Sequence, residues 1–581
     1  MSYAGIIDRA NPTRERQDYE ARVVAECNQE FSQLQVYRAV FAEQWDEVAQ
    51  LADPPSCNTF YYGNYNFPGL KKSDRQVDAS AMQALDRFAS ILDSLLTPRN
   101  MTWHMLGSES DYVMKNRDAR LWFEQATRAM FKYRYAPIGN FSAQNQNIYK
   151  HLGAYGTGNM FVDQATNEAG VPVQGLRYKS IPLGQMFLRE NHQNLINGFC
   201  RWYRMTGQQA MDAFGDKCPA RLKEQALKSS QMPYDFLHRV CPRNDYDPRR
   251  LDTKGKPYAS YNICLTTNEF ISEGGYNQFP LASSRYIQRP GEVYGFGALM
   301  AVLPSMKTLN AQKRDFLTQG HRAASPVYLV EDDGIMSWNF RPDAINSGGM
   351  RDGKPTVGIL PTGEIQVSKE MMAEEKAIID GACLVDLFKI LLSDPKVFSA
   401  TQVVEMISQR GILIAPVVGR QQSEYLGPMI VRELALLEDM RLLPPMPRII
   451  QEARGSGQII YTSPLARDMR ASEVAGFNRT LETALSVVNA TQDPAPLDRF
   501  AFDRIIPAVA KINGMPESWT ASDQEVAQKQ QVRQQAAEQQ AKIQAMPAQA
   551  AMMKAKAASG GRGGLPPEAQ VQAPLPAPGA Q

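Results

Sequence analysis

A glycine-rich stretch that ends in lysine is the part of the sequence closest to a catalytic motif. Residues 348–354 read Gly-Gly-Met-Arg-Asp-Gly-Lys and match the first seven positions of the phosphate-binding loop G-x-x-x-x-G-K. The eighth position of that motif carries a serine or threonine that binds magnesium, and a helix follows. Here Pro355 takes the eighth position, and residues 356–360 have the composition of a strand. The stretch is therefore predicted to be a glycine turn.

Two aspartates form the centre of the densest carboxylate cluster. Asp332 and Asp333 follow Glu331 and precede Gly334. Paired carboxylates can bind magnesium, whereas Asp-Gly is also a common turn between two strands. The turn is the favoured interpretation, with the acidic groups on a solvated or DNA-repelling surface. The metal-binding alternative stays open at this stage.

Histidines and cysteines show no metal-binding pattern. The five histidines are far apart, and no two of the seven cysteines have C-x-x-C spacing. A structural zinc site is therefore not expected, and no cofactor is predicted. An odd number of scattered cysteines fits reduced thiols made in a cytoplasm better than a disulfide framework.

Two lysines lie close to a break in the predicted helical pattern. Asp394 and Pro395 end the helical pattern of residues 369–392, because the residue before a proline is disfavoured in a helix. Lys389 precedes the break and Lys396 lies within it. These charges are either ordinary solvated surface or part of a loop that touches phosphate groups.

The elements that must position these residues change in type along the chain. Apolar residues recur at helical spacing first, short strand-like runs follow, and long helices then return. Helices are predicted from residue 11 to the prolines at 54 and 55, and over residues 74–96, 110–135 and 142–152; strands over 160–163, 174–180, 185–188, 196–203, 263–267 and 269–271; and later helices over 467–489 and 498–512, after a strand at 457–461. The pattern predicts a mixed α+β protein.

The most informative feature is a pair of long helices that flanks a small β insert. Residues 298–324, interrupted early by Pro304, and residues 369–392 read as helices, and residues 327–360 read as short strands with many glycines and prolines. Beyond Trp519 the chain is rich in Gln and Ala, and its last thirty or so residues are expected to be disordered.

The composition excludes several classes of protein. Lys and Arg total 63 and Asp and Glu total 61, so the net charge of +2 argues against a protein that coats nucleic acid, although local patches remain allowed. No run reaches the ~20 apolar residues that span a bilayer, and the first residues lack the features of a signal peptide. The length of 581 residues allows about three to five folding units.

Several short strings, taken together and in order, resemble the portal (head-to-tail connector) family of short-tailed double-stranded-DNA bacteriophages. Each string alone is weak, but they span about residues 19–470. They are Asp78-Ala-Ser-Ala, Leu95-Leu-Thr-Pro98 with Trp103, Asn140-Phe-Ser, Gly156-Thr-Gly158, Pro290-Gly-Glu-Val-Tyr-Gly295, Leu303-Pro304 with Lys307-Thr-Leu-Asn310, Asp332-Asp333-Gly334, Pro342-Asp-Ala-Ile-Asn346, Ser399-Ala-Thr401 with Val404-Glu405, Gly419-Arg420-Gln421 with Glu424, and Tyr461-Thr-Ser-Pro-Leu-Ala466.

The resemblance implies a predominantly α-helical α+β fold with the portal architecture of wing, stem, clip and crown around a central channel. The implied boundaries are 1–297 for the wing, 298–326 and 369–392 for the stem helices, 327–368 for the clip, 393–401 for a tunnel loop, 402–466 for the long wing helix and return strand, 467–520 for the crown, and 521–581 for the tail.

The resemblance also implies a function that is not enzymatic. A homododecameric ring at one capsid vertex would conduct DNA during packaging and ejection, within a virion assembled in the host cytoplasm. Its partners would be the terminase large subunit, tail adaptor proteins, the major capsid and scaffolding proteins, and double-stranded DNA bound without sequence preference; no membrane is involved. Lys389 and Lys396 would contact DNA in the channel, and Asp332, Asp333, Arg341 and Arg351 would dock partners at the clip.

Two alternatives from other classes stay open. One is a metal- or nucleotide-dependent DNA-processing enzyme that uses Asp332 and Asp333, or the degenerate loop from Gly348 to Lys354. The other is a helical scaffold of the cytoplasm.

Overall fold

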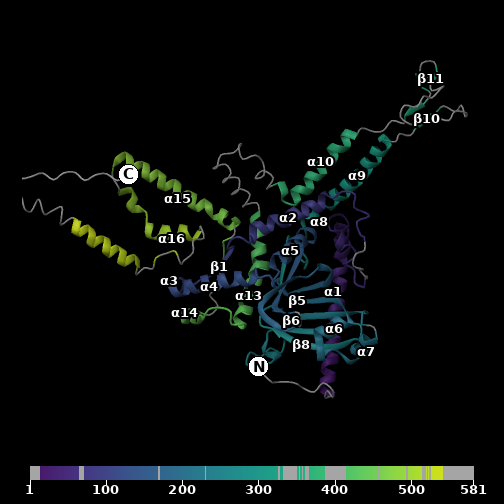
Figure 1. The fold of residues 1–581 in the computed structure, drawn as a ribbon, viewed down its shortest axis with the longest axis horizontal. Helices are drawn as coiled ribbons and strands as arrows, with labels where there is room; N and C mark the ends of the chain where they lie inside the picture. The colour runs from purple at the N-terminus through teal and green to yellow at the C-terminus, as the bar shows by residue number, and fades with distance from the viewer. Residues whose placement is uncertain are drawn as a thin grey trace, which may run out of the picture. The chain divides into compact units, whose positions relative to one another are not determined.

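The computed structural model describes residues 14–63, 71–167, 170–228, 230–324, 328–330, 350–351, 354–355, 357–359, 365–386, 414–453, 457–462, 464–492, 495–512, 519, 521 and 525–540. The chain divides into one compact unit that ends at Met515 and a second that begins at Pro516. Figure 1 shows the first unit as helices around antiparallel sheets. The protein is therefore of the mixed α+β class, as predicted.

A five-stranded antiparallel sheet lies against the first helix, α1 (Arg14–Ala52). The sheet has the order β4 (Met186–Glu190), β5 (Ile196–Thr206), β6 (Pro233–Pro242), β7 (Tyr258–Cys264) and β8 (Glu269–Tyr276). Leu237 faces α1, whereas its neighbour Phe236 faces α6 (Gly207–Phe214) and α7 (Ala220–Lys228), because successive strand residues point to opposite faces. Helices thus cover both faces of this sheet (Figure 1).

The main core surrounds a three-stranded sheet in which β2 (Thr157–Thr166) lies between β3 (Pro172–Ser180) and β9 (Leu281–Arg285). Apolar side chains of α2 (Ser80–Leu96), α4 (Arg117–Arg134) and α5 (Phe141–Tyr155) pack there. A separate two-stranded sheet pairs β1 (His104–Ser108) with β14 (Gly457–Tyr461). These two strands join segments that lie about 350 residues apart in the chain, as their register shows.

Three of the helix predictions for the part of the chain before Gly156 were wrong at their ends or in their continuity. The helix predicted over residues 74–96 begins only at Ser80. The helix predicted over 110–135 is two helices, α3 (Asp111–Lys115) and α4, because the side chain of Asn116 accepts from the N–H groups of Asp118 and Ala119 and caps α4. The helix predicted over 142–152 continues to Tyr155 and ends at Gly156.

The helix–insert–helix pattern is present in the described residues. Pro304 lies in the first turn of α9 (Leu303–Ala324), after the short α8 (Ala298–Ala301). The insert contains β10 (Tyr328–Val330) paired with β13 (Val357–Ile359), and β11 (Met350–Arg351) paired with β12 (Lys354–Pro355). The returning helix α10 (Ile365–Ala382) is shorter than the predicted 369–392 at its end, because Leu384 adopts a left-handed backbone conformation.

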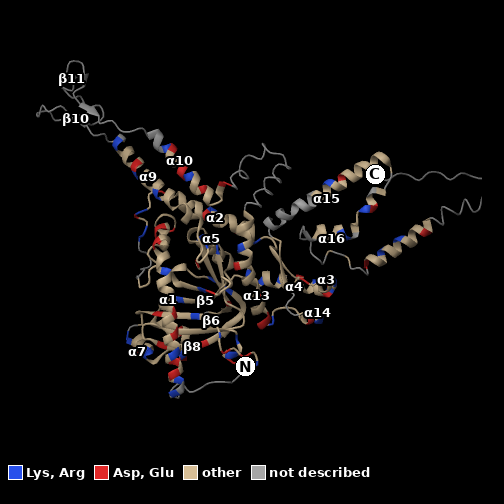
Figure 2. Cartoon of the chain, turned by 180° about the vertical axis from the view of Figure 1, so that it is seen from behind, with Lys and Arg blue, Asp and Glu red and all other residues tan. Residues whose placement is uncertain are grey.

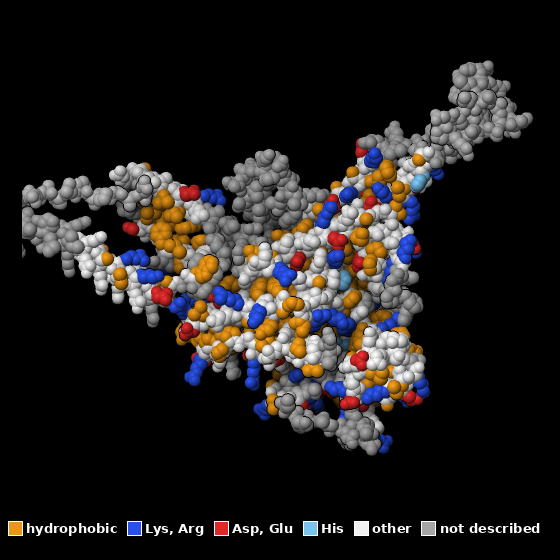
Figure 3. Space-filling view, viewed as in Figure 1, with side chains coloured by type: hydrophobic (Ala, Val, Ile, Leu, Met, Phe, Trp, Pro, Cys, Tyr) orange, Lys and Arg blue, Asp and Glu red, His pale blue; other side chains and the backbone are white. Residues whose placement is uncertain are grey.

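The C-terminal part of the first unit is helical apart from β14. Residues 414–420 lead into the π-helical η6 (Gln421–Leu426), α13 (Gly427–Asp439) and α14 (Arg448–Glu452), and α15 (Pro464–Thr491) and α16 (Phe502–Ile512) follow β14. Apolar side chains are exposed on α15 and α16 (Figure 3), among them Leu485, Val487 and Ile506. No helix in the described ranges is long and apolar enough to cross a membrane.

In the second unit, residues 525–540 form a helix within the segment rich in Gln and Ala. Every side chain in this helix is exposed. It is therefore a solvated helix in the subunit.

Candidate functional site: a polar junction at the base of helices α9 and α10

The base of α9 is held by one asparagine side chain. Asn310 Oδ1 accepts from the backbone N–H groups of Val77 at 2.7 Å and Asp78 at 3.2 Å, and its Nδ2 donates to the Arg75 carbonyl at 2.9 Å. These bonds satisfy backbone groups outside a helix. They also hold the backbone of Val77 and Asp78 outside α2, which agrees with the start of α2 at Ser80 rather than at residue 74.

Two glycine segments touch backbone to backbone beside this base. Gly156 ends α5 with a φ of +75°, and a Cβ placed on it would lie 2.5 Å from the amide nitrogen of Gly297. The Gly295 N–H donates to Thr157 Oγ1 at 2.8 Å, and the Tyr286 N–H donates to the Gly156 carbonyl at 2.9 Å. Only glycine fits both the left-handed conformation and this approach.

A buried arginine joins β9 to the π-helical η6. Arg285 is about 1% exposed, and its Nε and Nη2 donate to the two carboxylate oxygens of Glu424, each at 3.0 Å. Its Nη1 donates to Glu190 on β4 at 3.2 Å. The Gln421 side chain donates to the Arg285 carbonyl at 3.2 Å and is bonded to the Ser284 hydroxyl. The paired contact with Glu424 is the fork geometry that guanidinium and carboxylate groups favour.

A chain of polar side chains links α2, α5 and η6 inside the main core. Asn145 Nδ2 donates to Asp93 Oδ1 at 2.7 Å and to Thr97 Oγ1 at 2.8 Å, and Tyr425 OH donates to Asn145 Oδ1 at 2.6 Å. Burial raises the pKa values of Asp93 and Tyr425 above their ordinary values. Because the network is satisfied within the protein, it fixes the three helices in one arrangement.

A second buried charge pair fastens α13 to α4. The side chains of Arg134 and Glu433 are both 0% exposed, and Arg134 Nε donates to each Glu433 oxygen at 3.2 Å. Tyr178 OH donates to Glu433 Oε1 at 2.7 Å. Burial and the Arg134 charge hold the pKa of His104 well below its ordinary value, so the neutral imidazole accepts from Arg134 Nη2 at 2.8 Å. The guanidinium also lies 4.6 Å from the centre of the Trp103 ring.

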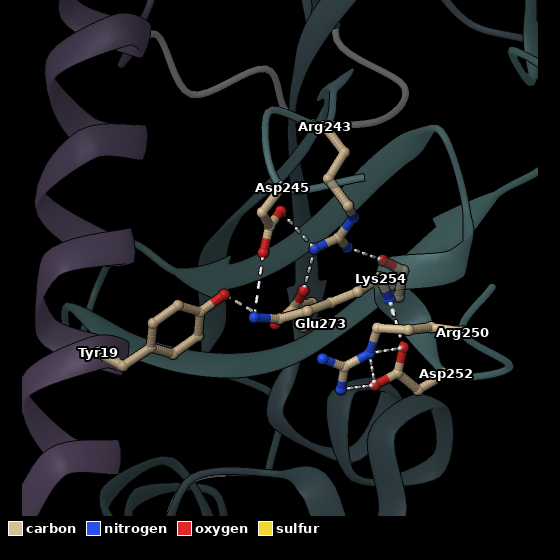
Figure 4. Close-up of polar contacts among 8 residues, drawn as sticks. Tyr19, Arg243, Asp245, Arg250, Asp252, Lys254 and Glu273 are labelled. Carbon is tan, nitrogen blue, oxygen red and sulfur yellow. Dashed lines mark hydrogen bonds and ion pairs between the residues drawn. The ribbon is translucent and has the colours of Figure 1, made fainter. Parts of the chain in front are cut away.

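A third cluster, nearer the start of α1, holds that helix to the five-stranded sheet (Figure 4). Tyr19 OH donates to Glu273 Oε2 at 2.9 Å, and Arg243 Nη1 donates to Glu273 Oε1 at 2.7 Å. Asp245 lies 3.5 Å from Arg243 and 3.1 Å from Lys254. The Arg243 side chain is 1% exposed, so its charge serves this contact rather than a ligand.

The contacts of these clusters fasten one element of the fold to another. Within the described ranges, no group of three or more His, Cys, Asp or Glu residues could hold a metal ion. All seven cysteines are free and buried. Burial raises the pKa of Cys27 to about 11 and that of Cys383 to about 12, which keeps both as thiols rather than nucleophilic thiolates.

The predicted site residues fall mostly in parts of the insert and of the helix break that lie beyond the ranges given above. Lys389, Lys396, Asp332, Asp333 and Arg341 lie outside the described residues. Arg351 is the exception, because its backbone pairs with that of Lys354 across β11 and β12.

The degenerate phosphate loop is followed by strand rather than helix. Lys354 and Pro355 form β12, and the next described residues, from Val357 to Ile359, form β13. A phosphate-binding loop needs a helix at this point, whose N-terminal N–H groups face the phosphates. The prediction of a strand here is confirmed, and the enzymatic alternative based on this loop loses its structural basis.

The structure brings together strings that sequence analysis singled out one by one. Asn310 accepts from the N–H of Asp78, and Gly156 lies against Gly295. Glu424, from another string, pairs with Arg285, which no string contained. Sequence analysis missed Arg134, Arg285 and Glu433. The available signal was a charged residue within an apolar helical stripe, as for Glu433 between Ile430 and Leu437.

Comparison with known proteins agrees with this structure. The family described as "Bacteriophage head to tail connecting protein" matches residues 24–520. The chain is 23% identical over 527 residues to the "Probable portal protein" of Bordetella phage BPP-1, covering 88% of this chain and 92% of that one. It is 22% identical over 536 residues to the "Portal protein" of Salmonella phage epsilon15, covering 89% and 92%. With its family's match extending over most of its length, this chain belongs to the bacteriophage head-to-tail connecting proteins.

Proposed function

We propose that the chain is a portal subunit that assembles, as twelve copies, into a closed ring around a DNA channel at one capsid vertex. The observation that carries this proposal is the family match over residues 24–520, which includes the helix–insert–helix segment. Contacts between different surfaces of identical subunits generate a ring when the rotation closes. The ring would conduct DNA during packaging and ejection.

The electrostatic balance of the chain supports a conduit. Each phosphate that a protein neutralises adds salt-dependent affinity for DNA. A wall past which DNA must move should therefore carry little net charge, and this chain has a net charge of +2. The buried arginines Arg134, Arg243 and Arg285 are paired with carboxylates and add no free positive charge.

The packaging motor and the tail would use the same ring at different times. In this proposal the terminase large subunit docks transiently on the clip, residues 327–368, and tail adaptor proteins later replace it. Asp332, Asp333, Arg341 and Arg351 supply the docking charges. Capsid and scaffolding proteins surround the ring, which assembles in the host cytoplasm and stays at the portal vertex of the virion.

The break over residues 393–401 is proposed to line the channel. Lys396, helped by Lys389, would give each subunit a positive charge near the duplex. At physiological ionic strength the field of a charge decays over about 8 Å, so only DNA inside the channel would feel it.

The experiment that tests the ring is electron microscopy of the purified chain combined with a mass measurement by light scattering. The expected result is a ring whose mass is close to twelve times 64.9 kDa. A monomer or dimer at micromolar concentration and moderate salt would contradict the proposal. ATP turnover that disappears in a Lys354→Ala variant would instead support an enzyme.

A further inference from the structure

The two long helices that flank the insert differ in the sign of their charge. Helix α9 carries four cationic residues and one anionic residue, a net charge of +3 with histidine neutral. Helix α10 carries two cationic and four anionic residues, a net charge of −2. Figure 2 shows these charges along the two neighbouring helices. The question is therefore which groups each of these two helices faces.

The outward faces are the exposed sides of the two helices, and each carries a charge without an ion-pair partner among the described residues. Lys307 is paired with Glu47 on α1. Arg314 on α9 and Glu374 on α10 are both exposed, and neither takes part in an ion pair with any residue that the structure describes. The opposite charges of α9 and α10 are therefore not neutralised by one another at these two positions.

Apolar side chains lie on the same outward faces. Arg314 and Leu317 are three residues apart on α9, and Leu317 is 43% exposed. On α10, Met371 and Ile378 flank Glu374 at helical spacing and are 50% and 44% exposed. Residues three, four and seven apart share one face of a helix. Each helix thus presents a charge beside exposed apolar surface.

The two faces lie at matching numbers of residues from the helix ends that border the insert. Arg314 is ten residues before the end of α9 at Ala324, and Glu374 is nine residues after the start of α10 at Ile365. Leu317 is seven residues before the end of α9, and Met371 is six residues after the start of α10. One residue corresponds to about 1.5 Å of rise, so the offset is smaller than a side chain.

We infer that the outward face of α9 in one subunit docks on the outward face of α10 in a second copy of this chain, with Arg314 paired to Glu374 and Leu317 packed on Met371 and Ile378. This inference rests on the proposed ring. In a ring whose axis runs along the helix pair, neighbouring subunits keep the small offset given above. The contact joins different surfaces and so is heterologous, as ring closure requires.

A charge-swap cycle on the full chain tests the inference. Arg314→Glu and Glu374→Arg should each weaken assembly, because each places two like charges together; about a tenfold rise in the concentration needed for half-assembly is expected at low salt. The double variant should restore assembly to within about threefold of the original chain. The loss in the single variants should shrink at high salt. Lys217→Glu, an equal charge change at an exposed position away from the stem, is the matched control and should assemble normally.

The outcomes separate this inference from the proposed function. If the original chain forms rings but both single variants assemble like Lys217→Glu, or the double variant is no better than the single ones, the α9–α10 docking is wrong and the ring stands. If the original chain forms no ring, the proposed function fails first. Circular dichroism of each variant shows whether its subunits are folded, so a loss of assembly in folded subunits supports the docking.

Discussion

The buried pair of Arg134 and Glu433 offers a sharp test of how α13 is fastened to α4. Replacing Glu433 by Gln keeps the shape of the side chain but removes its charge. Arg134 is then left as a cation with 0% exposure. Removing one partner of a buried ion pair costs about 3–5 kcal/mol, because the remaining charge is buried without compensation. No discount for solvent screening applies, since neither side chain reaches water.

The structure gives an independent magnitude for this loss. Arg134 Nε lies 3.2 Å from each carboxylate oxygen of Glu433. Two unit charges at this separation interact by about 5 kcal/mol at an effective dielectric constant of about 20. Both routes therefore predict a loss of several kcal/mol. Since each 1.4 kcal/mol is a factor of ten, local opening of the contact between α4 and α13 should become about 100-fold more frequent or more.

Hydrogen exchange measured by mass spectrometry is the assay, because it reports opening segment by segment. Amides of α13 and β1 should lose about two orders of magnitude of protection in the Glu433→Gln variant, whereas those of β8 should change little. The matched control is Glu224→Gln, the same chemical change in the ion pair with Lys228, whose side chains are 69% and 72% exposed. It should alter exchange by only a few-fold.

A second variant keeps the reasoning falsifiable if the first one fails to fold. Arg134→Met combined with Glu433→Gln removes both charges, and it should recover much of the lost protection. An effect of Glu433→Gln that matches the Glu224→Gln control would refute the account. So would a double variant that is less protected than Glu433→Gln alone.

Four further outcomes follow from the structure and the proposed ring. Gly156→Ala should prevent soluble folding, because its Cβ would lie 2.5 Å from a backbone nitrogen. Gly63 also has a positive φ but has nothing within 4 Å of its Cβ position. Gly63→Ala should therefore lower the free energy of unfolding by only about 1–2 kcal/mol, measured by urea unfolding. Burial lowers the pKa of His238 to about 3, below its ordinary 6.5. The unfolded chain therefore binds a proton that the folded chain does not, and the free energy of unfolding should fall as the pH drops from 6.5 toward 3. In His238→Asn this fall should be smaller, and an unchanged pH dependence in urea unfolding would count against the reasoning. A chain truncated after Ala521 should still form rings in electron micrographs, since residues 525–540 bury no side chain, and failure to assemble would show that the tail is needed. Lys396→Ala should leave the ring intact but alter DNA retention or late packaging, measured as the DNA content of filled heads; a disrupted ring would contradict the tunnel-loop placement.

Sequence patterns predicted elements well where neighbouring residues decide the structure. The π-helical segment and the late start of α2 depend on partners far along the chain, such as Asn310 for the backbone of Val77. Strand β1 was missed for the same reason, because its partner β14 lies about 350 residues away and Gly107 interrupts its apolar pattern. Local propensity carries no information about such contacts.

In the candidate site, too, the sequence indicated individual residues but not their distant partners. The strings with Asn310, Gly156 and Glu424 were singled out from the sequence, but their pairing became visible only in the structure. The buried arginines were missed because an arginine in an amphipathic helix or strand looks like a surface residue. Only burial distinguishes Arg285, which is 1% exposed, from a solvated cation.

The placement of these arginines suits the DNA channel of the proposed ring. A wall that guides DNA must resist force without holding the duplex, and free guanidinium groups would bind phosphates. Arg134, Arg243 and Arg285 are instead buried against glutamates, where each charge fastens elements that are distant in sequence. Breaking any of these pairs would both loosen the wall and release a cation. A variant that breaks one of these pairs should therefore make the proposed ring both less rigid and more strongly bound to DNA, because the same guanidinium group serves as the internal contact and would become the free charge.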